Sequence, residues 1–191
     1  MSGPEIDPPT STGVLVICTA NICRSPVAAQ MVRDRGAARG LNLSVGSAGF
    51  LEDGRPADAT MAALALGRGT NVGDHRSRVI DEERLRGADV VVTMERRHAR
   101  ELVVMAPDVG HRIHTLLGLI EAGRFQPVQG NLDEWLGALT EGRQAADLMG
   151  DRGPDHVPDP HGRAKRHYRN CLDTLDEAVE DLVELLSPFA H

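Results

Sequence analysis

Two short stretches of the sequence consist almost entirely of apolar residues, and they limit the possible folds more than any other feature. They are Val14–Cys18 (VLVIC) and Ala88–Met94 (ADVVVTM). Runs of this length between turn residues are typical of strands buried on both faces, as in parallel sheets covered by helices. Two further strands are expected at Leu41–Val45 and Arg112–Leu116.

Segments with helical periodicity lie between these runs. Helices are expected at about residues 26–38, 56–66, 95–105 and 164–186, with a further helical patch at 132–139. The last helix carries one apolar stripe, formed by Tyr168, Cys171, Leu172, Leu175, Val179, Leu182 and Leu186. This alternation predicts an α/β fold, a parallel sheet covered on both faces and joined by right-handed crossovers. Ligands of such sheets bind beyond the carboxyl ends of the strands.

The chain length of 191 residues suits one domain. Residues 1–12 contain three prolines and many small polar residues, which predicts a disordered N-terminal lead-in. Residues 13–191 are expected to form a single domain. Within it, residues 119–156 are less periodic and hold several glycines, and we interpret them as an insertion or lid.

Charge and cysteine content argue against several classes of function. The formal net charge of −7 disfavours a general nucleic-acid binder, which normally presents a basic face. No apolar run is long enough to span a bilayer, and the N-terminal segment lacks the features of a signal peptide. Three cysteines are too few for a disulfide framework. These features predict a cytoplasmic protein whose thiols stay reduced, and they leave its oligomeric state open.

Residues 18–25, CTANICRS, form a C-x5-R-S segment between the first strand and a helix. A tight loop that runs into a helix N-terminus directs backbone N–H groups toward a bound anion. Arg24 can add a bidentate contact to two phosphate oxygens, and such a positive field favours the nucleophilic thiolate form of a cysteine. The segment therefore predicts phosphoryl transfer through a phosphocysteine at Cys18, with Ser25 placed to hydrogen-bond the sulfur.

A buried thiol at the end of a strand is also a common structural role for cysteine, and a bare C-x5-R match arises by chance. The apolar strand before Cys18 and the Ser-Pro pair after Arg24 favour the catalytic interpretation. Departure of an alkoxide or phenolate requires a proton. The segment HVPDPHG offers Asp159, whose backbone is restricted by a proline on each side. Asp-Pro alone is ordinary turn chemistry, so the cysteine loop is the reason to assign Asp159 as the acid.

Segments of the chain, VLVICTANICRSP and the later VPDP, strongly resemble the low-molecular-weight protein tyrosine phosphatases. The segments SAG, HRSR and ADVVVTMERRH resemble that family in the same order, so the resemblance covers about residues 13–118 and 155–187. It implies a three-layer α/β fold with a four-stranded parallel sheet flanked by helices. It also implies no metal, no cofactor, and hydrolysis of phosphotyrosine or a similar phosphomonoester.

Carried onto matching positions, the resemblance makes Cys18 the nucleophile and Arg24 the ligand of phosphate and transition state. Asp159 becomes the general acid and then the base for water. Asn21 is expected to hold the loop in shape through three partners, Ser25, Ser47 and His75. A lone histidine in DHRSR is usually a surface residue, so that role for His75 competes with an ordinary one. Phosphate binding or loop support is expected of Thr19, Ala20, Ile22 and Cys23.

The substrate wall departs from the family pattern. Ile22 is expected to form an apolar wall, with Phe50 or Leu51 opposite. After the Asp-Pro pair, many members present aromatic residues, whereas this chain has His161 and Gly162. The family usually has glycine at the position of Ala20, which is tolerable if that backbone keeps a negative φ or a mild strain.

The resemblance also implies a reversible disulfide between Cys18 and Cys23 that protects the nucleophile from over-oxidation. The alternative, that Cys23 only packs under the loop, stays open. Cys171 lies on the apolar stripe and is expected in the core. A metal site at Cys18 and Cys23 is disfavoured because no nearby histidine pair completes it.

Other functions on this scaffold remain alternatives. An arsenate reductase needs further cysteines to relay a disulfide outward, and only Cys171 is available. A protein arginine phosphatase tends to have a small polar residue at the position of Ile22, so Ile22 favours tyrosine, although His161 points the other way. A catalytically idle phosphate-binding module is the non-enzymatic alternative.

Overall fold

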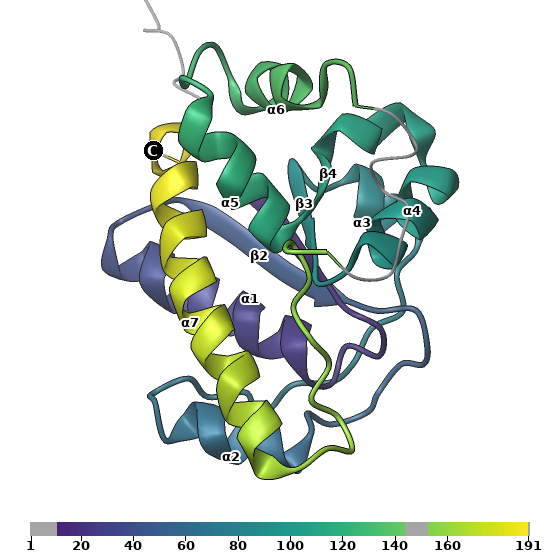
Figure 1. Ribbon diagram of the computed structural model, residues 1–191, viewed down its shortest axis with the longest axis vertical. Helices are drawn as coiled ribbons and strands as arrows, with labels where there is room; N and C mark the ends of the chain where they lie inside the picture. The colour runs from purple at the N-terminus through teal and green to yellow at the C-terminus, as the bar shows by residue number, and fades with distance from the viewer. Residues whose placement is uncertain (1–10, 144–152, 191) are drawn as a thin grey trace, which may run out of the picture.

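The computed structural model describes residues 11–143 and 153–190. Its centre is one parallel sheet with the strand order β2-β1-β3-β4 (Figure 1). The strands are β1 (Thr12–Ile17), β2 (Leu43–Ala48), β3 (Val90–Thr93) and β4 (Ile113–Thr115). All three pairings are parallel, so the expected four-stranded parallel sheet is confirmed.

Helices cover both faces of this sheet and make it the middle of three layers (Figure 1). The helices are α1 (Arg24–Ala38), α2 (Ala59–Leu66), α3 (Glu82–Arg86), α4 (Arg96–Met105), α5 (Leu116–Phe125), α6 (Leu132–Thr140) and α7 (Lys165–Leu186), with short 3-10 helices at η1 (Pro107–Arg112) and η3 (Ser187–Phe189). Val14 and Val16 of β1 join a core with α1, α2, α5, α6 and α7. Leu15 and Ile17 face the opposite core with α3 and α4, as the twofold alternation of a strand requires.

The long C-terminal helix is where the sequence predicts it. Helix α7 has all seven residues of the predicted apolar stripe buried. It packs against α1, α2 and α5. A stripe of this length is unambiguous in sequence because only one helical face can satisfy it.

The second strand lies later than the sequence indicates, at Leu43–Ala48 rather than Leu41–Val45. Gly46 and Ser47 look like turn residues, but each is paired with a residue of β1. The register with the neighbouring strand therefore decides the boundaries of β2.

Two helices, α3 and α5, form where the sequence predicts none. Helix α3 has five residues, too few to show a period. Helix α5 contains Gly118 and Gly123, and glycine disfavours helix. A Cβ atom at Gly123 would lie 2.6 Å from Leu185 Cδ1 of α7. The glycine thus permits close packing of α5 on α7, which outweighs its poor propensity.

Residues 119–156 contain most of α5 and all of α6, whose Trp135 is buried with its ring 5.4 Å from that of Phe189. Residues 144–152 lie outside the described part, so an insertion or lid stays a prediction. The predicted lead-in also lies mostly outside it, although Thr12 already belongs to β1 and donates its hydroxyl to the Phe189 carbonyl at 2.8 Å. None of the helices in the described ranges is long and apolar enough to cross a membrane.

Candidate active site

The loop between β1 and α1 lies beyond the carboxyl end of β1. From β1 the chain continues to β2 on one side, and β3 then pairs on the other side. This end of β1 is therefore the switch point at which open α/β sheets bind ligands. Within the described residues, no protein acceptor is found for the backbone amides of residues 19–24. Together with the N-terminus of α1, these amides can bind an anion.

Asn21 is the centre of the loop's support. It is the one described non-glycine residue with a positive φ, 51°, so Ala20 avoids that strain. Its Nδ2 donates to the hydroxyls of Ser25 and Ser47, each at 2.9 Å. Its backbone oxygen lies 2.6 Å from His75 Nε2, which must carry the hydrogen because a carbonyl only accepts. These bonds compensate the 1–3 kcal/mol that such a backbone conformation typically costs.

Cys18 lies at the start of the loop and is buried. Its Sγ is 3.0 Å from Ser25 Oγ. Ser25 Oγ accepts from Asn21, and its own hydrogen can point either at the sulfur or at the Ala48 carbonyl, which is farther away at 3.5 Å. A cavity of about 180 Å³ opens here, and its lining includes Cys18, Ile22, Arg24, Leu51, Asp159 and His161.

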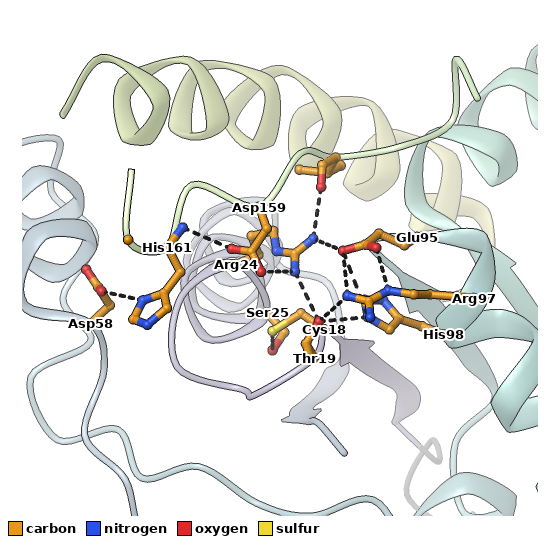
Figure 2. A network of polar contacts seen from close by, with 12 residues as sticks. Cys18, Thr19, Arg24, Ser25, Asp58, Glu95, Arg97, His98, Asp159 and His161 are labelled. Carbon is orange, nitrogen blue, oxygen red and sulfur yellow. Dashed lines mark hydrogen bonds and ion pairs between the residues drawn. The ribbon is translucent and has the colours of Figure 1, made fainter. Parts of the chain in front are cut away.

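Arg24 is almost completely buried, and both terminal nitrogens of its guanidinium donate to neighbouring groups (Figure 2). Its NH1 donates to Glu95 Oε1 at 2.5 Å and to the Val157 carbonyl at 3.0 Å. Its NH2 donates to Asp159 Oδ2 at 2.6 Å and to Thr19 Oγ1 at 3.3 Å, and its buried Nε has no partner among the described residues. The Nε–NH2 edge can therefore bind two oxygens of one phosphate once Asp159 leaves NH2.

Arg24 stays protonated despite its burial. Burial alone lowers the pKa of Arg24, but nearby Cys18, Asp159 and Glu95 raise it above its ordinary value. The group is thus a permanent cation, and because it is buried its attraction for a phosphate dianion is stronger than in bulk water.

The acid candidate and the substrate wall lie at the mouth of the cavity. Asp159 keeps 38% of its side chain exposed, so its carboxyl can reach a leaving group. Ile22 and Leu51 line the cavity as expected for a wall. Phe50 does not line it and instead stacks on His98 with ring centroids 5.5 Å apart, which leaves Leu51 as the opposing wall.

Comparison with known proteins agrees with this geometry. The family model described as low molecular weight phosphotyrosine protein phosphatase matches residues 13–129. A curated relative, the low molecular weight protein-tyrosine-phosphatase Etp of Escherichia coli, is 36% identical over 175 residues, covering 91% of this chain and 94% of the relative. The chain belongs to the low-molecular-weight phosphotyrosine protein phosphatase family. Members of this family are hydrolases that work through a phosphocysteine intermediate, the chemistry that the C-x5-R-S segment predicts.

Solved structures of low-molecular-weight phosphatases share the fold. The low molecular weight protein tyrosine phosphatase from T. tengcongensis is 28% identical, with a TM-score of 0.68 over 91% of this chain and 99% of that one. The YwlE arginine phosphatase from Geobacillus stearothermophilus is 23% identical, with a TM-score of 0.69 over 93% of this chain and 94% of that one. This second likeness concerns the fold alone.

Glu95 is a further residue at the site of this low-molecular-weight phosphatase, one that no sequence motif indicated. Its carboxylate is largely buried and binds both Arg24 and Arg97. Burial alone raises the pKa of Glu95, but hydrogen bonds from Arg97 and Arg24 lower it to about 2. A signal was present, since Glu95 follows β3 at the edge of the sheet where ligands bind.

The Thr19 side chain is held by two residues of α4, the helix that follows Glu95. Its hydroxyl lies 2.8 Å from Arg97 NH2 and 3.0 Å from His98 Nε2. Burial lowers the pKa of His98 to about 3, so this ring stays neutral. Gly49, directly after β2, lies close against the loop, because a Cβ atom there would be 2.7 Å from the Asn21 nitrogen. That close approach explains the glycine of the SAG segment.

Replacement of Glu95 by glutamine is expected to lower kcat/KM for p-nitrophenyl phosphate by about 10- to 100-fold. A hydrogen bond between charged groups contributes about 1.5–3 kcal/mol. Glutamine is neutral and offers one acceptor oxygen to two arginines, Arg24 and Arg97, so the hold on the Arg24 guanidinium in its phosphate-binding orientation weakens. Steady-state kinetics measure the effect, and Glu101→Gln on the exposed side of α4 is the matched control. Unchanged kinetics for Glu95→Gln would show that Arg24 does not depend on this carboxylate.

The three cysteines are free and buried. Cys23 also lines the cavity, and burial raises the pKa of its thiol. Cys171 lies in the core as expected, where burial raises its pKa to about 12. Among the residues described, no group of three or more His, Cys, Asp or Glu is arranged to hold a metal ion.

Proposed function

We propose that this phosphatase hydrolyses phosphotyrosine in proteins, or similar aryl phosphomonoesters. The observation that carries the proposal is the arrangement of Cys18, Arg24 and Asp159 around one cavity. Ile22 and Leu51 offer apolar surface to an aromatic ring at the mouth of that cavity. The name of the Escherichia coli relative, a protein-tyrosine-phosphatase, agrees with this substrate class.

In the first step, Cys18 Sγ attacks phosphorus while the bond to the leaving oxygen breaks. Asp159 gives its proton to that oxygen, and the loop amides and Arg24 bind the equatorial oxygens. The carboxylate now bonded to Arg24 NH2 must first turn outward, because phosphate takes the same donor, and take up a proton from solvent before it can act as the acid.

In the second step, water attacks phosphorus and loses its proton to Asp159. The bond from sulfur to phosphorus then breaks, and inorganic phosphate leaves. The hydroxyl of Ser25, 3.0 Å from Sγ, stabilises the departing thiolate.

The proposed function predicts that the pure, reduced protein hydrolyses p-nitrophenyl phosphate and phosphotyrosine peptides. A phosphoarginine peptide of the same sequence is expected to be a poorer substrate, because Ile22 presents an apolar wall to the narrower, more polar phosphoguanidinium group. Release of inorganic phosphate from the two peptides measures the preference. Faster release from phosphoarginine would assign the second function, which His161 at the rim favours.

The thiol chemistry has two further consequences. A reversible disulfide between Cys18 and Cys23 would protect the nucleophile from over-oxidation, and both thiols line the same cavity. Catalysis requires reduced Cys18, so the cytoplasm is the proposed location.

With a net charge of −7, nucleic acid is not a proposed partner.

A further inference from the structure

Asp58 contacts the phosphate-binding loop, helix α2 and the segment that follows Asp159. Its backbone N–H donates to the carbonyl of Ile22 in the phosphate-binding loop at 2.7 Å. Its Oδ1 accepts from the Met61 amide at 2.9 Å and so caps α2. Its Oδ2 lies 2.9 Å from His161 Nδ1 and accepts from the Tyr168 hydroxyl at 3.3 Å. Asp58 therefore links the phosphate-binding loop to the segment that carries Asp159.

His161 continues this link to the acid. Its backbone N–H donates to Asp159 Oδ1 at 3.1 Å, while its ring pairs with Asp58 (Figure 2). The next residue, Gly162, donates its N–H to the Tyr168 hydroxyl at 3.1 Å. Burial raises the pKa of Tyr168, so its hydroxyl keeps the hydrogen that it donates to Asp58. Two neighbouring residues of the acid loop are thus tied to one carboxylate.

We infer that Asp58 and His161 are positioning residues that hold Asp159 over the leaving group. The inference rests on the proposed function, in which Asp159 is the general acid. When phosphate takes Arg24 NH2, Asp159 loses its shortest contact, 2.6 Å. The His161 amide still binds its carboxylate, and the Asp58–His161 pair fixes that amide relative to the phosphate-binding loop.

The pair contributes little to folding stability, since the His161 side chain is 53% exposed and solvent weakens a contact at the surface. Its effect is geometric. A displacement of about 1 Å in a catalytic group can cost up to about 100-fold in rate.

Asp58 both caps α2 and pairs with His161, and substitution can separate these two roles. A carboxylate has two oxygens that both accept, whereas an amide has one. Asp58→Asn can therefore keep the cap on α2, where asparagine is as good as aspartate. It replaces the oxygen that faces His161 by an N–H donor, so the bond from His161 Nδ1–H to a carboxylate is lost. His161→Leu removes the donor, and His161→Asn places an amide N–H near the position of Nδ1.

The test compares two substrates that differ in their need for an acid. Phenol is a poorer leaving group than p-nitrophenol, so phenyl phosphate depends more strongly on proton donation. For His161→Leu and Asp58→Asn, kcat/KM for phenyl phosphate is expected to fall about tenfold more than kcat/KM for p-nitrophenyl phosphate. His161→Asn should restore much of the difference. If the two residues had a purely structural role, kcat/KM would fall by the same factor for both substrates.

The matched control is His111→Leu, which removes a histidine–aspartate pair of similar geometry. His111 Nε2 lies 2.8 Å from Asp133, next to the amino end of β4 and away from the site. This variant should leave the ratio of the two substrates unchanged. Adding His161→Leu to Asp159→Asn should not change the ratio further, because no acid remains to be positioned.

The outcomes separate the two proposals. If the wild-type protein hydrolyses neither substrate, the proposed function is wrong. If Asp159→Asn alters the ratio but His161→Leu and Asp58→Asn do not, the function stands and the positioning role is wrong. Equal losses for both substrates in these two variants would also overturn the positioning role.

Discussion

Replacement of Cys18 by serine is expected to abolish hydrolysis of p-nitrophenyl phosphate to the background rate. A serine hydroxyl is a far weaker nucleophile than a thiolate, and its pKa is not brought near neutrality by a phosphate-binding loop. Every other group of the site would remain in place in this variant. The measurement is release of p-nitrophenol by the reduced protein over a long time course.

Two controls make this result specific. Cys171→Ala removes a thiol that lies in the core, and it is expected to retain activity. Calorimetric titration with inorganic phosphate should show that Cys18→Ser still binds the anion, because Arg24 and the loop amides are unchanged. Turnover that survives in Cys18→Ser would refute the phosphocysteine mechanism. Phosphate binding without turnover in the wild type would instead support an idle phosphate-binding module.

Replacement of Asp159 by asparagine is expected to lower kcat for p-nitrophenyl phosphate by roughly 10²–10⁴-fold, the usual contribution of a general acid or base. The amide is isosteric with the carboxyl group but can neither protonate the leaving oxygen nor accept a proton from water. Steady-state kinetics across pH measure the loss.

Asp155 provides a matched control for Asp159→Asn. It lies on the same segment, but it is engaged by Arg96 at 2.9 Å and by Thr115 at 2.9 Å and does not line the cavity. Asp155→Asn should therefore change stability more than chemistry. If Asp155→Asn and Asp159→Asn lowered kcat equally, the loss would be structural and Asp159 would not be the acid.

The parts of the fold that the sequence predicts correctly are those in which one pattern excludes its alternatives. The run VLVIC has no polar face, so it fits only a strand buried on both sides, and β1 is where it is expected. Helix α7 is equally clear, because its apolar stripe has one period. The bounds of β2 and the existence of α5 depend on neighbours that a local pattern does not contain.

The same distinction applies to the site. Cys18 and Arg24 are separated by five residues, so a single loop motif reveals them. Glu95 and Asp58 lie 71 and 34 residues from Arg24 in the chain, and only the packing of β3 and α2 beside the loop brings them near it. Glu95 also resembles an ordinary charged residue at the start of a helix. Sequence spacing alone could not show that its carboxylate anchors a buried guanidinium.

The contact between Arg24 and Asp159 also bears on how a turnover ends. The unliganded protein already supplies an anion of its own to the donor that a phosphate must occupy. Substrate affinity is therefore reduced by the free energy of separating this internal pair, and so is the affinity for inorganic phosphate. Once Asp159 has released to solvent the proton that it took from water, its carboxylate can return to the guanidinium and compete with the product for it. The residue that assists bond cleavage thereby also promotes product release and limits product inhibition.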